Sequence, residues 1–121
     1  MKRRTFVLAG LALAAATAAP ADPVRLSADE IDTLLRGKRI EGDWNGTKYV
    51  QVFRDTGGTI YTAEGAPPDP GKWRVNAETD TYESWWERSG WSSYAIERDG
   101  AALYWVDSRG RRYPFKVQDA P

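Results

Sequence analysis

Carboxylates are the side chains best suited to acid–base chemistry in this sequence, because the chain has no His and no Cys. Glu41, Asp43, Glu83 and Glu87 lie in segments with strand-like alternation. Two carboxylates can serve as acid and base only when they face each other across a cleft at a defined separation. No motif in the sequence indicates such a carboxylate pair. The sequence also has no phosphate-loop motif, no nucleophile-elbow motif and no spacing typical of metal ligands. We therefore predict a protein that is not an enzyme, with no catalytic residue, metal or cofactor.

Aromatic side chains are the second group that could do chemistry, here by stacking on a ligand or a partner. The chain has six Trp, six Tyr and three Phe, more than a small core needs. Trp85 and Trp86 are adjacent, so on one strand they must point to opposite faces. We predict a binding surface made by Trp85, Trp86, Trp91, Tyr104 and Tyr61. The alternative is that the helix or a second copy of the chain covers these rings.

Length and charge restrict the class of protein. The 121 residues allow one domain, and the 17 basic residues balance the 17 acidic ones. Residues 1–21 hold Lys2, Arg3 and Arg4 and no acid, which leaves 14 basic residues against 17 acidic ones after them. A mildly acidic domain is a poor nucleic-acid binder, because phosphate contacts need basic patches. The absence of Cys excludes a disulfide scaffold and a lipid-modified Cys.

The first 21 residues have the pattern of a cleavable export signal. Three basic residues precede an apolar run over 6–16, and Ala19 and Ala21 form a small-x-small cleavage site. Arg3 and Arg4, followed by Thr-Phe-Val, match much of the twin-arginine export pattern; the general secretory route is the alternative. We predict cleavage near Ala21, a periplasmic or secreted product without a stable membrane span, and a single domain over 22–121.

One short helix is predicted over 28–36. Ser27 and Glu30 have the spacing of a capping box, and Gly37 is a stop signal. Ile31, Leu34 and Leu35 repeat at helical spacing. An isolated helix of this length is marginal, so this apolar stripe must pack on the rest of the domain.

After Gly37 the periodicity changes to alternation, with a turn signal about every ten residues. Asn45-Gly46 and Asp99-Gly100 are strong two-residue hairpin signals. The predicted strands are 38–44, 47–54, 58–64, 71–76, 81–87, 92–98, 101–107 and 111–118. No connection has room for a crossover helix, so consecutive strands must be antiparallel neighbours. Closure removes the exposed edges of such a meander, and we predict a small, mainly β, up-and-down barrel with the helix over one mouth or seam.

Alternation also predicts which side chains fill the barrel, and the opposite positions are often charged. The Trp residues of this set, Trp44, Trp73 and Trp105, are assigned structural roles. The full inward set is Ile40, Trp44, Tyr49, Phe53, Ile60, Trp73, Val75, Tyr94, Ile96, Leu103, Trp105, Tyr113, Phe115 and Val117. Large aromatics suit a domain of about 100 residues, which buries only about two-thirds of its unfolded surface.

Gly42-Asp43-Trp44, on the first strand after a short helix, resembles the Gly-x-Trp signature of lipocalins, and Gly71-Lys72-Trp73 matches it again. That resemblance implies a barrel that carries a small apolar ligand. The order of Leu26–Gly37, Tyr49–Phe53, Gly71–Val75, Trp86, Tyr94–Gly100 and Phe115–Val117 is similar to a family of small exported bacterial proteins known only as a domain of unknown function. Members carry a Cys pair in the neighbourhood where Glu83, Ser84 and Ser93 stand here, so the resemblance implies the fold and compartment without that bridge.

Three classes of function follow. The leading hypothesis is a non-enzymatic envelope module that recognises a protein or glycan through exposed aromatics. The first alternative is a lipocalin-like carrier of a small apolar ligand, which requires a hollow barrel. The second is an inhibitor of a hydrolase or protease, since the predicted fold resembles small periplasmic barrels that inhibit secreted metalloproteinases with their N-terminal segment. The corresponding segment here, 22–27, leads at once into the capped helix.

Overall fold

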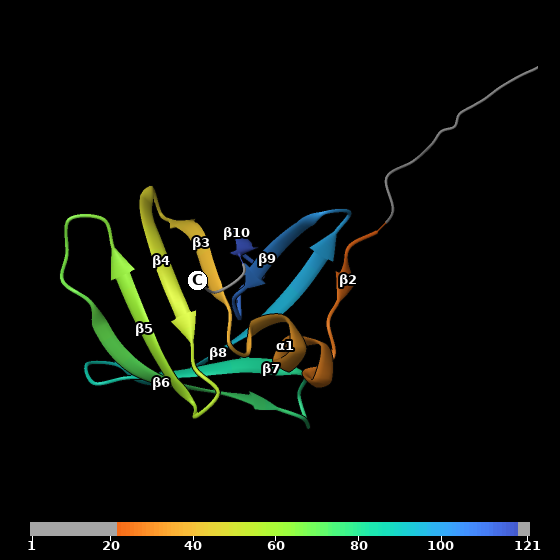
Figure 1. Cartoon of the computed structure of the whole chain (residues 1–121). Helices are drawn as coiled ribbons and strands as arrows, with labels where there is room; N and C mark the ends of the chain where they lie inside the picture. Colours follow the sequence, from red (N-terminus) through yellow and green to blue (C-terminus); the bar gives the residue numbers. More distant parts are fainter. Residues whose placement is uncertain (1–21, 119–121) are drawn as a thin grey trace, which may run out of the picture.

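A computed structural model describes residues 22–118 of the chain as one antiparallel β-barrel (Figure 1). The predicted export signal lies outside the described residues. The strands of the barrel are β3 (Arg39–Trp44), β4 (Thr47–Phe53), β5 (Gly58–Ala63), β6 (Asp69–Asn76), β7 (Thr81–Trp86), β8 (Gly90–Asp99), β9 (Ala102–Val106) and β10 (Arg112–Gln118). Each strand pairs with the next, and β10 pairs with β3, which closes the barrel. The predicted mainly β, eight-stranded meander is therefore confirmed.

The hairpin turns explain the meander. Asn45 and Gly46 both have positive φ, at 52° and 90°, which is the backbone of the tight turn that the Asn-Gly pair favours between strands. The Asp43 carboxylate accepts a hydrogen bond from the Gly46 amide at 2.7 Å and holds this turn in place. Strand boundaries fall within two residues of the predicted ones.

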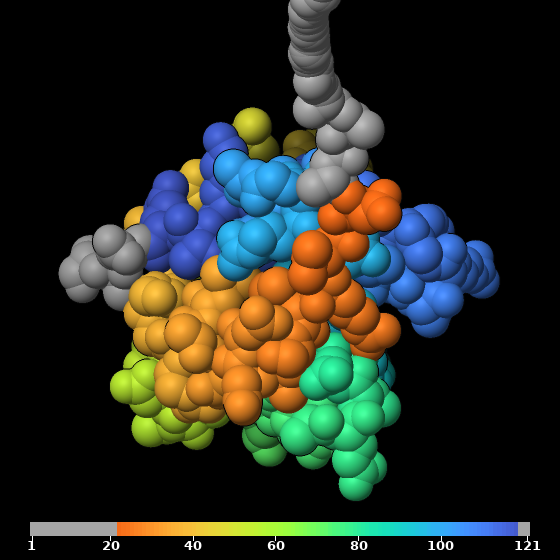
Figure 2. Space-filling model, turned by 90° about the vertical axis from the view of Figure 1, so that its right-hand side faces the viewer, coloured from red at the N-terminus to blue at the C-terminus, as the bar shows by residue number. Residues whose placement is uncertain are grey.

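The helix α1 (Ala28–Leu35) covers one end of the barrel, together with the two-residue strand β2 (Val24–Arg25). Ser27 Oγ accepts from the Glu30 amide at 3.2 Å and Glu30 Oε1 accepts from the Ser27 amide at 2.8 Å, so the predicted capping box is present. Ile31 and Leu35 are fully buried against the barrel. Figure 2 shows the segment of residues 22–40, in orange, lying across β8 and the β6–β7 turn.

Strand β2 was not predicted. It pairs with Arg98 and Glu97 of β8, and the Leu26 amide then donates to the Ile96 carbonyl at 2.9 Å. Strand β8 is long enough, at ten residues, to pair with β7 along its first half and with both β9 and β2 along its second half. The long strand therefore anchors the N-terminal segment to the barrel.

The core contains most of the predicted inward residues. Buried among them are Ile40, Tyr49, Phe53, Trp73, Ile96, Leu103, Trp105 and Phe115, and Trp44, Val75, Tyr94, Tyr113 and Val117 pack against these. Ile60 is a wrong assignment, because its neighbour Thr59 is 1% exposed and successive strand residues alternate in face. The register explains this: Thr59 lies opposite the buried Phe53, and Ile60 opposite Val52 on the outer face.

Within the described residues, no helix has the length and apolar character to cross a membrane.

Candidate functional site

A cavity of about 360 Å³ opens at the end of the barrel opposite α1. We call it the mouth cavity, and its walls are mainly aromatic rings that point inward from several strands. The lining residues are Trp44, Tyr49, Gln51, Tyr61, Asp69, Tyr82, Ser84, Trp86, Arg88, Ser89, Ser92, Tyr94 and Trp105. Its size and composition match small-molecule sites, which are concave, mostly apolar and about 300–1,000 Å³ in volume.

The rings of the mouth cavity meet one another largely edge to face. Trp44 and Tyr94 are almost perpendicular at 5.6 Å between centroids, and Tyr61 and Trp86 meet at 70° and 6.0 Å. Tyr49 stacks on Tyr61 at 4.9 Å. Such contacts hold the rings through their quadrupoles and add stability beyond area burial. Contacts between neighbouring rings therefore hold the walls in place, and no side chain packed into the cavity is needed for this.

Two inward-facing glycines make room for these rings. A Cβ built on Gly42 would lie 2.6 Å from the Tyr49 hydroxyl, and one on Gly71 would lie 2.6 Å from the Trp86 ring. Gly42 is directly opposite Tyr49 in the β3–β4 register, and an aromatic ring covers the glycine as it does in other sheets. Both glycines belong to the Gly-x-Trp repeats, so the repeat has a packing reason in this barrel.

Polar side chains form the floor of the mouth cavity. Gln51 Nε2 donates to Thr59 Oγ1 at 2.9 Å and to the Tyr82 hydroxyl at 3.2 Å. Trp86 Nε1 donates to Ser84 Oγ at 3.1 Å, and Trp105 Nε1 donates to the Tyr49 hydroxyl at 3.0 Å. Buried polar groups are costly unless they are hydrogen-bonded, so this network keeps a polar floor inside an aromatic barrel.

The phenols of the mouth cavity stay neutral over a wide pH range. Burial raises the pKa of Tyr82 to about 12 and raises the pKa of Tyr49 further. Burial also raises the pKa of Tyr61 and Tyr94, which line the more open part of the cavity. A phenol that keeps its proton can donate and accept hydrogen bonds, which suits recognition of a polar group on a ligand.

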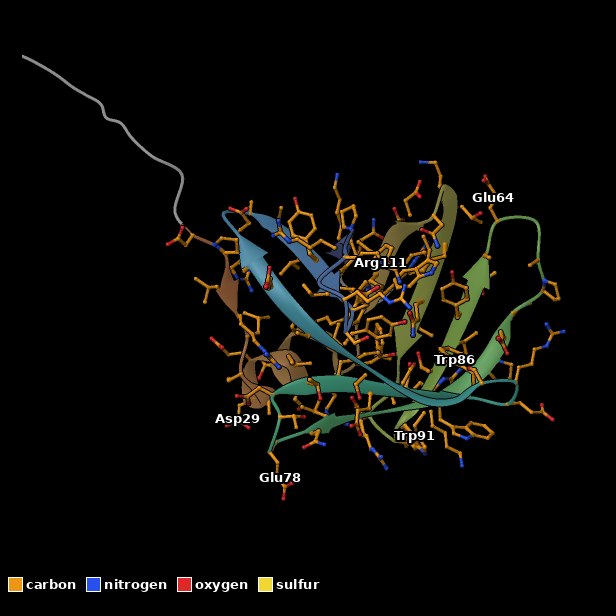
Figure 3. The ribbon with its side chains drawn as sticks, turned by 180° about the vertical axis from the view of Figure 1, so that it is seen from behind. Asp29, Glu64, Glu78, Trp86, Trp91 and Arg111 are labelled. Atoms are coloured by element: carbon orange, nitrogen blue, oxygen red, sulfur yellow. The ribbon has the colours of Figure 1, made fainter. Side chains whose placement is uncertain are left out.

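The five predicted binding aromatics fall in three places. Tyr61 and Trp86 face the interior and line the mouth cavity. Trp85 and Trp91 lie opposite each other in the β7–β8 register, on the outer face of this hairpin. Figure 3 shows Trp91 on the other side of the hairpin from Trp86. Tyr104 lies on β9 opposite Glu97, six residues beyond Trp91 along β8, or about 20 Å at 3.3 Å per residue.

Each outer ring lies in contact with a basic side chain. Lys72 Nζ lies 4.9 Å from the Trp85 ring centroid, and the Arg74 guanidinium lies 3.7 Å from that of Trp91. We call Lys72, Arg74, Trp85 and Trp91 the outer aromatic patch; within it, Trp91 keeps 43% of its surface exposed. Tyr104 lies 4.1 Å from the Arg112 guanidinium. Cation–π contacts of this kind stabilise exposed rings without a ligand.

Sequence reasoning missed part of the lining. Trp44, Tyr49, Tyr94 and Trp105 were assigned to packing, and they also line the mouth cavity. Gln51, Tyr82 and Ser92 are not singled out by the sequence, and Ser84 enters there only through the missing Cys pair. The signal that could have found them is the set of polar residues at inward-facing strand positions, for example Gln51 between Tyr49 and Phe53.

Glu83 and Ser93 lie directly opposite each other, and the Ser93 hydroxyl donates to the Glu83 carboxylate at 3.2 Å.

No group of three or more His, Cys, Asp or Glu side chains within residues 22–118 is arranged to hold a metal ion. Comparisons of the chain with protein-family models, with curated proteins and with solved structures find no match. The class of protein must therefore be inferred from the site itself.

Proposed function

We propose that this protein is a non-enzymatic binding module that holds a small ligand in the mouth cavity. The cavity is the observation that carries the proposal, because a barrel filled with side chains would leave no such space. Ring walls with a hydrogen-bonded polar floor favour a flat or apolar ligand with a polar group, bound between Trp44, Tyr61 and Trp86. This proposal follows the carrier hypothesis, because the ligand lies inside the barrel rather than on exposed aromatics.

A binding role is favoured over catalysis by the chemistry of the lining. Among the described residues that form the mouth cavity, the one carboxylate is Asp69. A second carboxylate across the cavity would be required for a paired acid and base. The tyrosines there keep their protons at neutral pH, so they serve as hydrogen-bonding groups rather than as bases.

Two Trp residues of the same hairpin allow a matched test. An apolar fluorescent dye, N-phenyl-1-naphthylamine, is titrated into the protein and into the variants Trp86→Ala and Trp91→Ala. We expect Trp86→Ala to weaken dye binding about tenfold or more, because one wall of the cavity is removed. Trp91→Ala, with the same loss of an indole on the outer face, is expected to bind like the parent. Circular dichroism shows whether both variants keep the fold.

Recognition of a larger partner through the outer aromatic patch is a second candidate function, favoured by the exposure of Trp91. The reverse outcome of the same experiment, with binding lost in Trp91→Ala and kept in Trp86→Ala, would assign the site to this patch. The inhibitor hypothesis has less support, since residues 24–26 are paired with β8 rather than extended from the barrel.

We also propose that the protein works outside the cytoplasm, on the basis of the basic, apolar and small-x-small segments of residues 1–21. Expression of the full chain in a bacterium, followed by fractionation and mass spectrometry, tests this. A periplasmic product that begins at Asp22 is expected. A cytoplasmic product that retains Met1–Ala21 would contradict export. Substitution of Arg3 and Arg4 by Lys, which blocks the twin-arginine route and leaves the general route open, distinguishes the two routes.

A further inference from the structure

The mouth cavity has one acidic and one basic side chain at its rim. Asp69 begins β6 and lies opposite Tyr61 in the β5–β6 register, so it shares the inward face with that ring. Arg88 is in the turn between β7 and β8, two residues after Trp86. The two charged groups therefore come from the start of β6 and from the β7–β8 turn, and both line the same opening.

Within residues 22–118, neither charge forms an ion pair. The ion pairs formed within residues 22–118 involve other side chains, such as Arg74 with Glu83 and Arg111 with Asp107. Asp69 and Arg88 are not in contact with each other or with any other charged described residue within ion-pair distance. Two opposite charges at the rim of one aromatic cavity, without an ion pair among the described residues, suit a ligand that carries both complementary charges.

We propose that the ligand of the mouth cavity is a small zwitterion with an aromatic side chain, of the free amino-acid class. This inference rests on the proposed function. The ammonium group would bind the Asp69 carboxylate, with the nearby ring faces adding cation–π attraction. The carboxylate would bind the Arg88 guanidinium, whose planar fork suits a carboxylate. The side chain would lie between Tyr61 and Trp86, above the floor formed by Gln51 and Ser84.

The alternatives by charge are less well matched. A cation would be attracted by Asp69 and repelled by Arg88. An anion would be attracted by Arg88 and repelled by Asp69. A neutral ligand would gain from neither and would displace water from both. Since the lining carries one charge of each sign, the structure selects a ligand of zero net charge with separated charges.

Four probes with the same phenyl ring test the charge preference: phenylalanine, phenethylamine, 3-phenylpropionate and 3-phenyl-1-propanol. Binding is followed by the emission of the protein's Trp residues under selective Trp excitation, since the probes contain none. Phenylalanine is expected to bind about threefold to tenfold more tightly than each probe that lacks one charge, because a charged hydrogen bond at an exposed rim has this modest strength. Equal affinity for all four probes would overturn the zwitterion proposal.

Variants that remove one charge at a time assign each charge to its partner. Asp69→Asn should abolish the advantage of phenylalanine over 3-phenylpropionate, and Arg88→Gln should abolish its advantage over phenethylamine. Glu78→Gln, in the β6–β7 turn at the other end (Figure 3), and Arg98→Gln, on the far half of β8, are the controls and should retain both preferences. Loss of preference in a control, or its retention in Asp69→Asn, would contradict the assignment.

Failure of this inference is distinguishable from failure of the proposed function. If none of the four probes binds while the apolar dye still binds in a Trp86-dependent way, the zwitterion proposal is overturned and the binding function stands. If the dye binds neither the parent protein nor the variants, both are overturned.

Discussion

The two ends of this barrel both use large hydrophobic side chains, but one end is fully packed and the other surrounds an open cavity. At the closed end, α1 inserts Ile31 and Leu35 against Phe53 and Trp73, and all four side chains are at most 3% exposed. At the open end, Trp44, Tyr61, Trp86 and Tyr94 are only partly buried and surround a cavity. One end therefore provides stability, while the other keeps aromatic surface available for a ligand.

The difference arises from what covers each end. The closed end is fastened by the N-terminal segment: the Ala28 amide donates to Asp80 Oδ1 at 2.8 Å, and Arg25 donates to the Thr79 carbonyl at 2.7 Å. No helix or strand of residues 22–118 lies over the mouth cavity, and its rings are held by one another and by inward glycines. A short capped helix is thus enough to make a small barrel asymmetric.

The largest expected effect separates the two ends by stability. Leu35→Ala removes a fully buried side chain from the closed end and should lower the free energy of unfolding by about 2–5 kcal/mol, because it leaves a cavity. Trp86→Ala at the mouth should cost less, about 1–2 kcal/mol, because that ring is only partly buried. Urea unfolding followed by circular dichroism measures both. Equal losses would remove the distinction between a stabilising and a binding end.

Gly71→Ala tests how the mouth is kept open. The added Cβ would lie 2.5 Å from the Trp85 carbonyl oxygen and 2.6 Å from the Trp86 ring, so a strand or a ring must shift. We expect a loss of about 1–3 kcal/mol together with weaker dye binding. Gly58→Ala is the matched control, because its Cβ would meet Arg54 at an ordinary 3.6 Å. A Gly71→Ala protein that unfolds and binds like the parent would contradict the packing role of this glycine.

Alkaline pH tests the floor that separates the two ends. Burial raises the pKa of Tyr82 from about 10, its unfolded value, to about 12, so the folded protein holds this proton more tightly. The stability contributed by the neutral phenol is complete below pH 10 and is lost as pH rises from about 10 to 12. The slope is about 1.4 kcal/mol per pH unit for one such group.

Tyr82→Phe should therefore flatten the fall in unfolding free energy between about pH 10 and pH 12 in urea titrations. Tyr104→Phe, at a ring on the outer face, is the control and should leave the slope unchanged. A parallel fall in the parent and in Tyr82→Phe would show that other groups control alkaline unfolding.

The smallest expected effect concerns the cap of α1. Ser27→Ala removes the hydroxyl that accepts from the Glu30 amide and should lower stability by about 1 kcal/mol. Ligand affinity should not change, because the cap lies at the end opposite the mouth cavity. Ser27→Asn, which can also cap, should restore most of the loss. Altered dye binding in Ser27→Ala would show that the two ends are coupled.

Local patterns predicted the elements of this barrel accurately. The capping box, the Asn-Gly turn and the alternation after Gly37 each depend on residues close together in the chain, so propensity and periodicity suffice. Strand β2 could not be predicted, because two residues are too few to show an alternating pattern. These residues form a strand only because they pair with the long strand β8. Alternation along the chain predicts an inward Ile60, and this is wrong because pairing with Val52 places it on the outer face.

The candidate site was less predictable, and the aromatics show why. Adjacency alone established that Trp85 and Trp86 point to opposite faces, and it could not say which of them faces inward. An amphipathic ring suits either face, so the choice was made by the register with Gly71 and by the cations above Trp85 and Trp91. The cavity itself depends on rings from strands far apart in the chain.

By itself, then, the sequence determined an eight-strand meander with a capped helix, because those features follow from neighbours along the chain. The tertiary structure decided which end the helix covers, which rings face inward and which charged side chains, such as Asp69 and Arg88, line the rim of one cavity. These features depend on inter-strand register and on the pairing of β3 with β10, and residues close together in the chain determine neither of them.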